Sequence, residues 1–324
     1  MKKVLLLVLI PALVLALAGC GPVMPIENDP PAALPESCMR YYDLAQAAPD
    51  AAQDAPRAAD AKKGDPRSFS VWHNGQYQNL AAGGGAGVYL KDIEDGRAVL
   101  SSGEMLWNGQ RYDCAVLTVD GGYVPNLSPN ENGGILRLEL QGDCWTDGGT
   151  AEDIGCFAGF NTVVLSGSGT LRIECGLSAG GGTLPLPALI LEGPALTCGT
   201  IGLEANTGAE DVPQLLVRAG SLEAEALLLS GDLCLTGGTV KTELVADAPY
   251  AVFRGGSFTT AAWGGADPTI LLSGGEAACT SWLPEGAVIE LGAGTLSAPG
   301  LSYMEKLHTY AGGVGIDLPS PPEA

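Results

Sequence analysis

The chain has little positive charge and almost no histidine. Its 324 residues include 16 lysines and arginines and 2 histidines against 37 aspartates and glutamates, which gives a net charge of −21 at pH 7. Because such a surface repels phosphate backbones, nucleic acid is excluded as an expected partner. His73 and His308 lie far apart and no Cys-x-x-Cys pair occurs, so a zinc site is not expected.

Long apolar runs are missing after the first 20 residues, so no membrane-spanning helix is expected there. Before that point, two lysines precede an apolar run that ends in Leu17, Ala18, Gly19 and Cys20. This order predicts a secretory signal peptide over residues 1–19.

The four residues Leu17 to Cys20 resemble the lipobox of bacterial lipoproteins. The resemblance implies cleavage before Cys20 and a diacylglyceryl group on its sulfur. We therefore expect a protein outside the cytoplasm, anchored to the lipid bilayer of a bacterial membrane through Cys20. Residues 20–67 are rich in Pro, Ala and Asp and are interpreted as a lipid-anchored linker.

A short pattern returns five times between Leu215 and Leu301: apolar, any residue, small, Gly, any residue, apolar. Its glycines are 18 or 19 residues apart, which is typical of repeats that stack to bury a shared core. We expect the glycine at a sharp corner that needs a positive φ. These glycines are Gly220, Gly238, Gly256, Gly275 and Gly294.

We call the equivalent positions of successive repeats a column. Counted from each repeat glycine, the columns two residues after it, three before it and five before it are apolar. The columns two residues before it and three after it are polar or small. This alternation predicts strands with one buried face. The fold class expected is all-β: a right-handed parallel β-helix over residues 111–303, with a C-terminal cap and tail over 304–324. A left-handed helix is disfavoured because its strict hexapeptide pattern is absent.

Residues 68–110 are expected to form an N-terminal β-hairpin cap. Trp72 to Tyr77 and Trp107 to Tyr112 each carry Asn-Gly between apolar positions, the strongest short hairpin signal. The aromatic residues here would serve either as a sugar platform or, as we favour, as a cover for the open edge of the stack.

Eight cysteines remain besides Cys20. Their even number permits disulfides outside the cytoplasm, but cysteine is also a small apolar residue that suits the interior of stacked repeats. We favour free, buried thiols.

The segments Val164–Ile173 and Leu233–Thr242 resemble the β-helical domain of bacterial surface lipoproteins described as carbohydrate-binding domain-containing proteins. The resemblance covers about residues 130 to 300. It implies a right-handed parallel β-helix and a noncatalytic, glycan-related role at the cell surface.

Ligand contacts are expected where the period breaks, in the loops Asp143–Gly159 and Ala205–Pro213, because insertions between stacked repeats often carry the binding function. No cofactor is required, although the acidic loop from Asp143 would accommodate calcium. The Gly-Gly-x-Gly-x-Asp repeat of calcium-binding β-rolls is absent. The candidate ligand-binding residues are Trp145, Glu152, Asp153, Glu210 and Asp211.

Three functions remain open. The favoured one is noncatalytic recognition of a glycan or another surface partner, and a structural spacer or adhesin is an alternative. The other alternative is a polysaccharide lyase or hydrolase of the pectin-lyase-like type. Between Gly142 and Gly300 only four residues are basic, which is a poor surface for a polyuronate substrate. Trp263 and Trp282 both lie seven after a repeat glycine, so both are expected in the core.

Overall fold

The computed structural model describes residues 40–41, 55–64, 68–73, 76–81, 88–89, 98–129, 133–146, 155–265, 267–299, 301, 306–309 and 315–316. The proposed signal peptide and Cys20 lie outside these residues. The described part contains the short 3-10 helix η2 (Ala61–Gly64) and no α-helix. No helix in this part is long and apolar enough to cross a membrane.

The strands are β1 (Ser68–His73), β2 (Gln76–Ala81), β3 (Val88–Tyr89), β4 (Ala98–Trp107), β5 (Gln110–Tyr123), β6 (Asn126–Pro129), β7 (Ile135–Thr146), β8 (Thr162–Gly167), β9 (Thr170–Ile173), β10 (Leu177–Gly180), β11 (Leu189–Glu204), β12 (Leu215–Leu229), β13 (Leu233–Leu235), β14 (Thr239–Ala246), β15 (Tyr250–Phe253), β16 (Ser257–Gly264), β17 (Thr269–Trp282), β18 (Val288–Ser297), β19 (Leu307–Thr309) and β20 (Gly315–Ile316).

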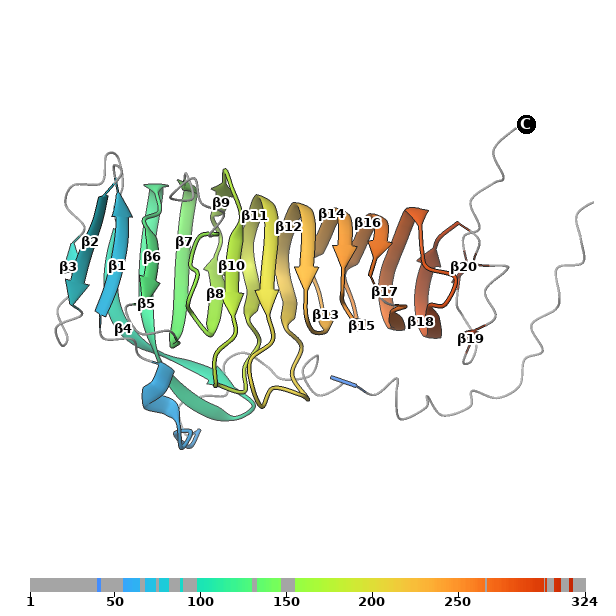
Figure 1. The fold of residues 1–324 in the computed structure, drawn as a ribbon, viewed down its shortest axis with the longest axis horizontal. Coiled ribbons are helices and arrows are strands. Elements are labelled where there is room, and N and C mark those ends of the chain that lie inside the picture. The colour runs from blue at the N-terminus through green and yellow to red at the C-terminus, as the bar shows by residue number, and fades with distance from the viewer. Residues whose placement is uncertain are drawn as a thin grey trace, which may run out of the picture.

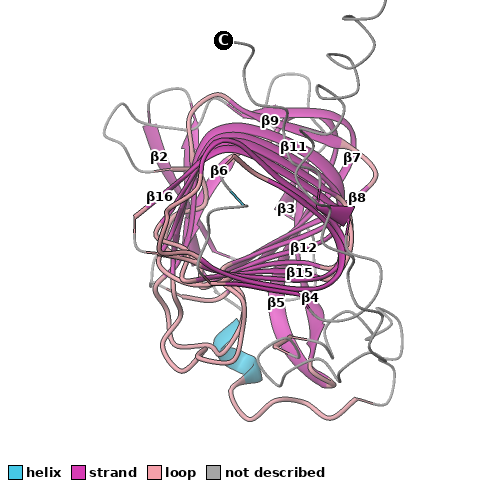
Figure 2. Ribbon diagram, turned by 90° about the vertical axis from the view of Figure 1, so that its right-hand side faces the viewer, coloured by secondary structure: helices cyan, strands magenta, loops and turns pink. Residues whose placement is uncertain are grey.

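From β5 onward these strands, except β6, which pairs antiparallel with β1, stack in parallel, side by side along the long axis of the molecule (Figure 1). Seen from the end, the stack forms a closed ring (Figure 2). The expectation of an all-β chain with parallel strands is confirmed.

The strands form three parallel sheets, and the repeats from β8 to β16 contribute to all three. The first sheet joins β8, β13, β15 and the starts of β11, β12, β17 and β18. The second joins β9, β14, β16 and the parts of β11, β12, β17 and β18 that follow the corner. The third joins β10 with the ends of β11, β12, β14 and β16. The strands of one repeat therefore surround the core on three sides.

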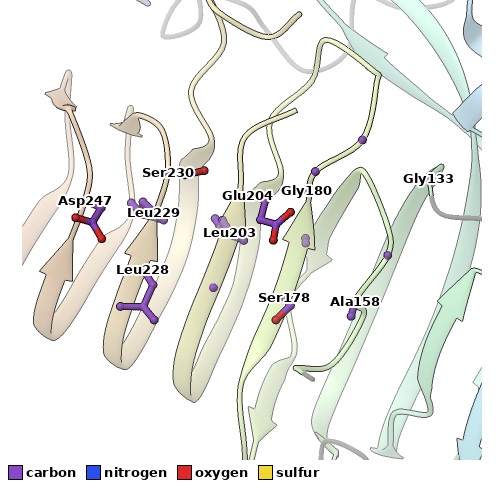
Figure 3. A pocket seen from close by; sticks show the side chains of 15 residues that line it. Gly133, Ala158, Ser178, Gly180, Leu203, Glu204, Leu228, Leu229, Ser230 and Asp247 are labelled. Atoms are coloured by element: carbon purple, nitrogen blue, oxygen red, sulfur yellow. The ribbon is translucent and has the colours of Figure 1, made fainter. Parts of the chain in front are cut away.

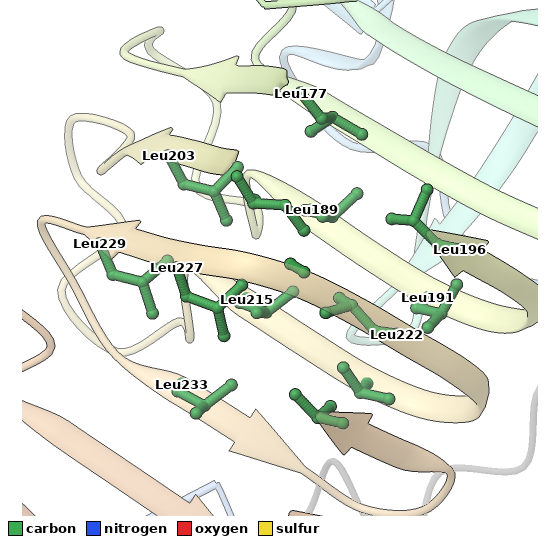
Figure 4. Packing of buried hydrophobic residues seen from close by; sticks show 14 of the residues in the cluster. Leu177, Leu189, Leu191, Leu196, Leu203, Leu215, Leu222, Leu227, Leu229 and Leu233 are labelled. Carbon is green, nitrogen blue, oxygen red and sulfur yellow. The ribbon is translucent and has the colours of Figure 1, made fainter. Parts of the chain in front are cut away.

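The interior is filled by the apolar columns that the sequence predicts. Leu189, Leu215 and Leu233 are paired in register and are fully buried. In the second sheet Leu222 pairs with Val240, and both are buried. Figure 4 shows the leucines of successive strands gathered in one interior space. Stacking buries what one repeat could not bury alone, and each fully buried leucine contributes roughly 1.5–3 kcal/mol.

All five repeat glycines have φ between 74° and 100°. A Cβ at Gly256 would lie 2.5 Å from the carbonyl oxygen of Gly238, the corner of the preceding repeat. The glycine is therefore required twice, by its backbone conformation and by the close approach of the neighbouring corner. The corner prediction is confirmed.

Both hairpins form. In the first, Trp72 pairs with Tyr77 across β1 and β2. In the second, Trp107 pairs with Gln110, and Asn108 and Gly109 between them have positive φ values of 46° and 69°, as a type I′ turn requires. Beyond the turn, β5 also pairs in parallel with β7, so this hairpin begins the stack.

The outward side of the first sheet is also apolar, which the sequence pattern did not predict. Four residues before the glycines lie Leu216, Cys234, Val252 and Leu271, all buried in a second hydrophobic cluster. Figure 2 shows β4, β5 and the short helix on this side of the ring. We call the segments that bury this column the cover: residues 40–41, residues 55–64, the far end of the β4–β5 hairpin, and Leu184 with Leu186.

The cover corrects the interpretation of residues 20–67 as a linker throughout. Tyr41, Ala58 and Ala61 are buried in the second cluster, and Arg111 donates to the carbonyl oxygen of Pro56 through its backbone N–H. The apolar side chains that these segments bring to the first sheet explain why they pack rather than extend.

The extra residues of the irregular repeats lie between the third and first sheets. Residues 181–188 separate β10 from β11 and residues 205–214 separate β11 from β12, whereas only residues 230–232 separate β12 from β13. Ser178 to Gly180 belong to β10. The prediction that Trp263 lies in the core is confirmed, but the same prediction for Trp282 is wrong. A register shift after Thr260 pairs Trp282 with Ala262 and leaves its side chain 51% exposed.

A candidate functional site at the end of the third sheet

A groove of about 560 Å³ crosses several repeats where the strands of the third sheet end. Its walls come from the ends of β10, β11 and β12, from the residue that follows β14, and from residues 133 and 158–159. Figure 3 shows the lining side chains carried by successive strands on one side of the stack.

Glycine shapes one wall of the groove. Gly180 and Gly181 have φ values of 100° and 73°, and a Cβ at Gly180 would lie 1.8 Å from the carbonyl oxygen of Glu204. Gly202 sits on the neighbouring strand, and the nearest atom to a Cβ there is 3.8 Å away. Because side chains are missing at these positions, backbone amides and carbonyls form the wall.

The remaining walls combine hydroxyls, carboxylates and one exposed apolar side chain. Ser178 and Ser230 contribute hydroxyls, and Glu204 and Asp247 contribute carboxylates. Leu228 is 43% exposed and lies among them. None of the lining residues in the described part of the chain is basic or aromatic. This chemistry suits an uncharged, hydroxyl-bearing ligand and repels polyanions.

The side chain of Asn206 holds the loop after β11 against the groove. Its Oδ1 accepts from the backbone N–H of Gly182 at 2.9 Å, and its Nδ2 donates to the carbonyl oxygens of Asn161 and Leu186 at 2.8 and 2.9 Å. The side chain is buried, so these bonds are shielded from water and fix the loop.

The structure separates the candidate residues that the sequence brought together. Trp145 belongs to β7 rather than to a loop, and its 42% exposed ring meets that of Tyr123 edge-on at 5.0 Å on the outward side of the second sheet. Glu210 and Asp211 are exposed in the loop between β11 and β12. Glu152 and Asp153 lie outside the described residues.

Basic residues near the cover are engaged in contacts within the chain. Arg218 donates to Glu192 at 2.5 Å and lies over the ring of Trp107 at 5.5 Å. Arg254 donates to Ser273 at 2.5 Å and to the carbonyl oxygen of Arg40. These guanidinium groups contribute to packing of the cover.

In the described part of the chain, no three His, Cys, Asp or Glu side chains are arranged to hold a metal ion. Cys144, Cys175, Cys198, Cys234 and Cys279 are free thiols, and all of these except Cys175 are buried, in line with the preference for free thiols at these positions. Burial raises the pKa of Cys198 and of Cys234 to about 12.

The sequence did not predict the side chains that supply the apolar surface and the carboxylates of the groove. Leu228 lies in an outward column that otherwise contains Ser178, Gly202, Ala246 and Gly264. A single large apolar residue among small ones was the available signal. Glu204 ends β11 and Asp247 follows β14, positions where surface carboxylates are common, so neither residue gave a signal in the sequence.

Comparison of the chain with models of protein families, with curated proteins and with solved structures yields no match in any of the three.

Proposed function

We propose that this protein binds a neutral glycan without cleaving it, outside a bacterial membrane to which an acylated Cys20 anchors it. The stack of parallel strands is then a right-handed parallel β-helix, the handedness that connections between parallel strands adopt almost always. Support for the anchor comes from the lipobox resemblance at Leu17 to Cys20.

The observation that carries the proposal is the composition of the groove. Carboxylates of Glu204 and Asp247 can accept hydrogen bonds from sugar hydroxyls, and Leu228 offers an apolar surface to the carbon-bound face of a sugar ring. A groove that crosses several strands, about 4.8 Å apart, suits an extended chain of sugars better than a compact ligand.

A glycan array tests this function on the full chain carrying Cys20→Ser, which keeps it out of the membrane. We expect binding to neutral oligosaccharides and none to polygalacturonate or alginate. Leu228→Asp should weaken binding at least about tenfold, because it removes the apolar contact and adds a charge. Glu223→Gln, at an exposed position in the second sheet, is the matched control. Binding that survives Leu228→Asp unchanged would rule out the groove, and a silent array would favour a spacer or adhesin.

Glycoside hydrolysis is a second candidate, because the groove contains two carboxylates. The backbones of Glu204 and Asp247 belong to strands two spacings apart, or ~10 Å, close to the roughly 6.5–9.5 Å between the carboxyls of inverting hydrolases. Release of reducing sugar from a bound oligosaccharide, lost in both Glu204→Gln and Asp247→Asn, would establish this activity. We expect no release.

A further inference from the structure

A smaller pocket of about 220 Å³ lies beside the groove, on the other side of the loop that follows β11. Ser230 lines both spaces, so they adjoin at this residue. The pocket walls come from residues 186–188, from residues 205–214, from the short turn after β12 and from Pro249.

One buried side chain in this pocket, that of Gln214, has a polar atom without a hydrogen-bond partner. Gln214 is 4% exposed, and its Nε2 donates to Ser230 Oγ at 3.2 Å. Its Oε1 has no hydrogen-bond partner. If the two amide atoms are exchanged, the nitrogen becomes the atom without a partner, so one unsatisfied polar atom remains in either orientation. Buried polar atoms are nearly always paired, and an exception in a cavity wall points to a ligand group that supplies the bond.

Two of the other strong hydrogen-bonding groups of the pocket are already in use. The Asp232 carboxylate accepts from Tyr41 Oη at 2.6 Å and pairs with Arg40 at 2.7 Å, and the Asn206 side chain holds the loop. A ligand thus meets the amide of Gln214, the hydroxyl of Ser230 and the exposed carboxylate of Glu210, which can accept a hydrogen bond from a ligand hydroxyl. Apolar surface comes from Leu186, Val212 and Pro249. This combination selects a small, uncharged ring that carries hydroxyls.

We infer that this pocket seats the terminal sugar ring of a glycan whose chain occupies the groove, with a ring hydroxyl bonded to the Gln214 amide. The inference rests on the proposed function. It assigns the pocket to the end of the glycan and the groove to its interior, so the protein distinguishes chain ends from internal segments.

Two sets of probes separate the two sites by saturation-transfer NMR on the full chain with Cys20→Ser. Methyl glycosides of glucose, galactose, mannose and N-acetylglucosamine report on the pocket, and cellohexaose, maltohexaose and xylohexaose report on the groove. We expect at least one methyl glycoside to bind. Its affinity should fall at least about tenfold in Gln214→Met, which keeps the length of the side chain and removes its polar atoms.

Val212→Trp is the second variant, because it fills the pocket with a large side chain and leaves Gln214 itself unchanged. Thermal unfolding of each variant shows whether it remains folded, and Gln214→Met should be no less stable than the wild type since it removes an unsatisfied group. Leu228→Asp is the groove control: it should weaken hexasaccharide binding and leave methyl glycoside binding intact.

The inference is overturned if no methyl glycoside binds the wild type, or if Gln214→Met and Val212→Trp bind it as the wild type does. Binding of a methyl glycoside that these variants abolish, with no hexasaccharide bound, would support the pocket while contradicting the proposed role of the groove.

Discussion

The guanidinium of Arg40 lies 2.7 Å from the carboxylate of Asp232, in the turn between β12 and β13. Tyr41 donates to the same carboxylate oxygen at 2.6 Å, and the Arg40 guanidinium also lies 4.5 Å from the ring centre of Tyr250. Asp232 is buried, and this burial raises the pKa of its carboxyl although Tyr41 and Arg40 oppose the shift. Residues 40–41 are thus fastened to the body by a shielded ion pair.

Asp232→Asn should release this contact, because it leaves the partly buried Arg40 without its counter-charge. In the wild type we expect trypsin to cleave slowly after Arg40, whose carbonyl and side chain are both engaged. Cleavage there should rise at least about tenfold in the variant, since it follows the population of the released form. Mass spectrometry of the fragments measures it.

Exposed Lys62 and Lys63 provide internal standards for the protease, and Asp211→Asn is the control for loss of a nearby exposed carboxylate. Equal cleavage after Arg40 in the wild type, Asp232→Asn and Asp211→Asn would show that the ion pair does not hold residues 40–41 on the body.

Gly256→Val should destabilise the chain by more than ~1 kcal/mol, because valine is strained at a φ of 79° and its Cβ meets the carbonyl of Gly238. Thermal or urea unfolding provides the measurement. Gly264→Ala is the matched control, since the nearest atom to a Cβ there is a leucine methyl 3.4 Å away. If both variants have the same unfolding midpoint as the wild type, the corner does not require glycine.

Thiol labelling should distinguish Cys175 from the buried cysteines. Because the pKa of Cys198 and Cys234 is raised to about 12, both stay protonated at pH 8 to 10, and the thiolate is the reactive form. We expect iodoacetamide to modify Cys175 in the folded chain and to reach Cys198 and Cys234 only after unfolding. Peptide mapping reads out each site, with Cys175→Ser as the control. Rapid labelling of Cys234 in the folded chain would contradict its place beneath the cover.

Cys20→Ser should abolish lipidation, because the sulfur is the proposed acyl acceptor. The variant is then expected in the aqueous phase of a detergent partition and the wild type in the detergent phase. Cys38→Ser, the next cysteine along the chain, should partition as the wild type does. A Cys20→Ser protein that still enters detergent would refute the lipobox interpretation.

The regular repeats could be predicted from the sequence because three local signals agree in them. At Gly256, for example, the apolar residues Phe253 and Phe258 alternate with polar positions around a glycine that only a corner explains. The β4–β5 hairpin was equally accessible, since Asn108 and Gly109 determine its turn within a few residues.

The cover and the groove could not be predicted in this way, because both depend on contacts between distant segments. Val252 points outward, and its burial follows only from the arrival of the hairpin and of residues 40–41. Similarly, Glu204 belongs to β11, Leu228 belongs to β12 and Asp247 follows β14, and their meeting depends on the register of the third sheet. The displaced Trp282 shows how one register shift reverses the face of a residue.

Arg40 also limits how this chain can change its length. It touches the carbonyl of Glu210, the carboxylate of Asp232 and the ring of Tyr250, which belong to three consecutive repeats. Gain or loss of a repeat between them would move these partners out of reach, so this region has a fixed number of repeats. After Leu271 the outward column reaches Glu290, which belongs to neither hydrophobic cluster. Repeats duplicated there would lengthen the molecule without disturbing the segment that Arg40 holds in place.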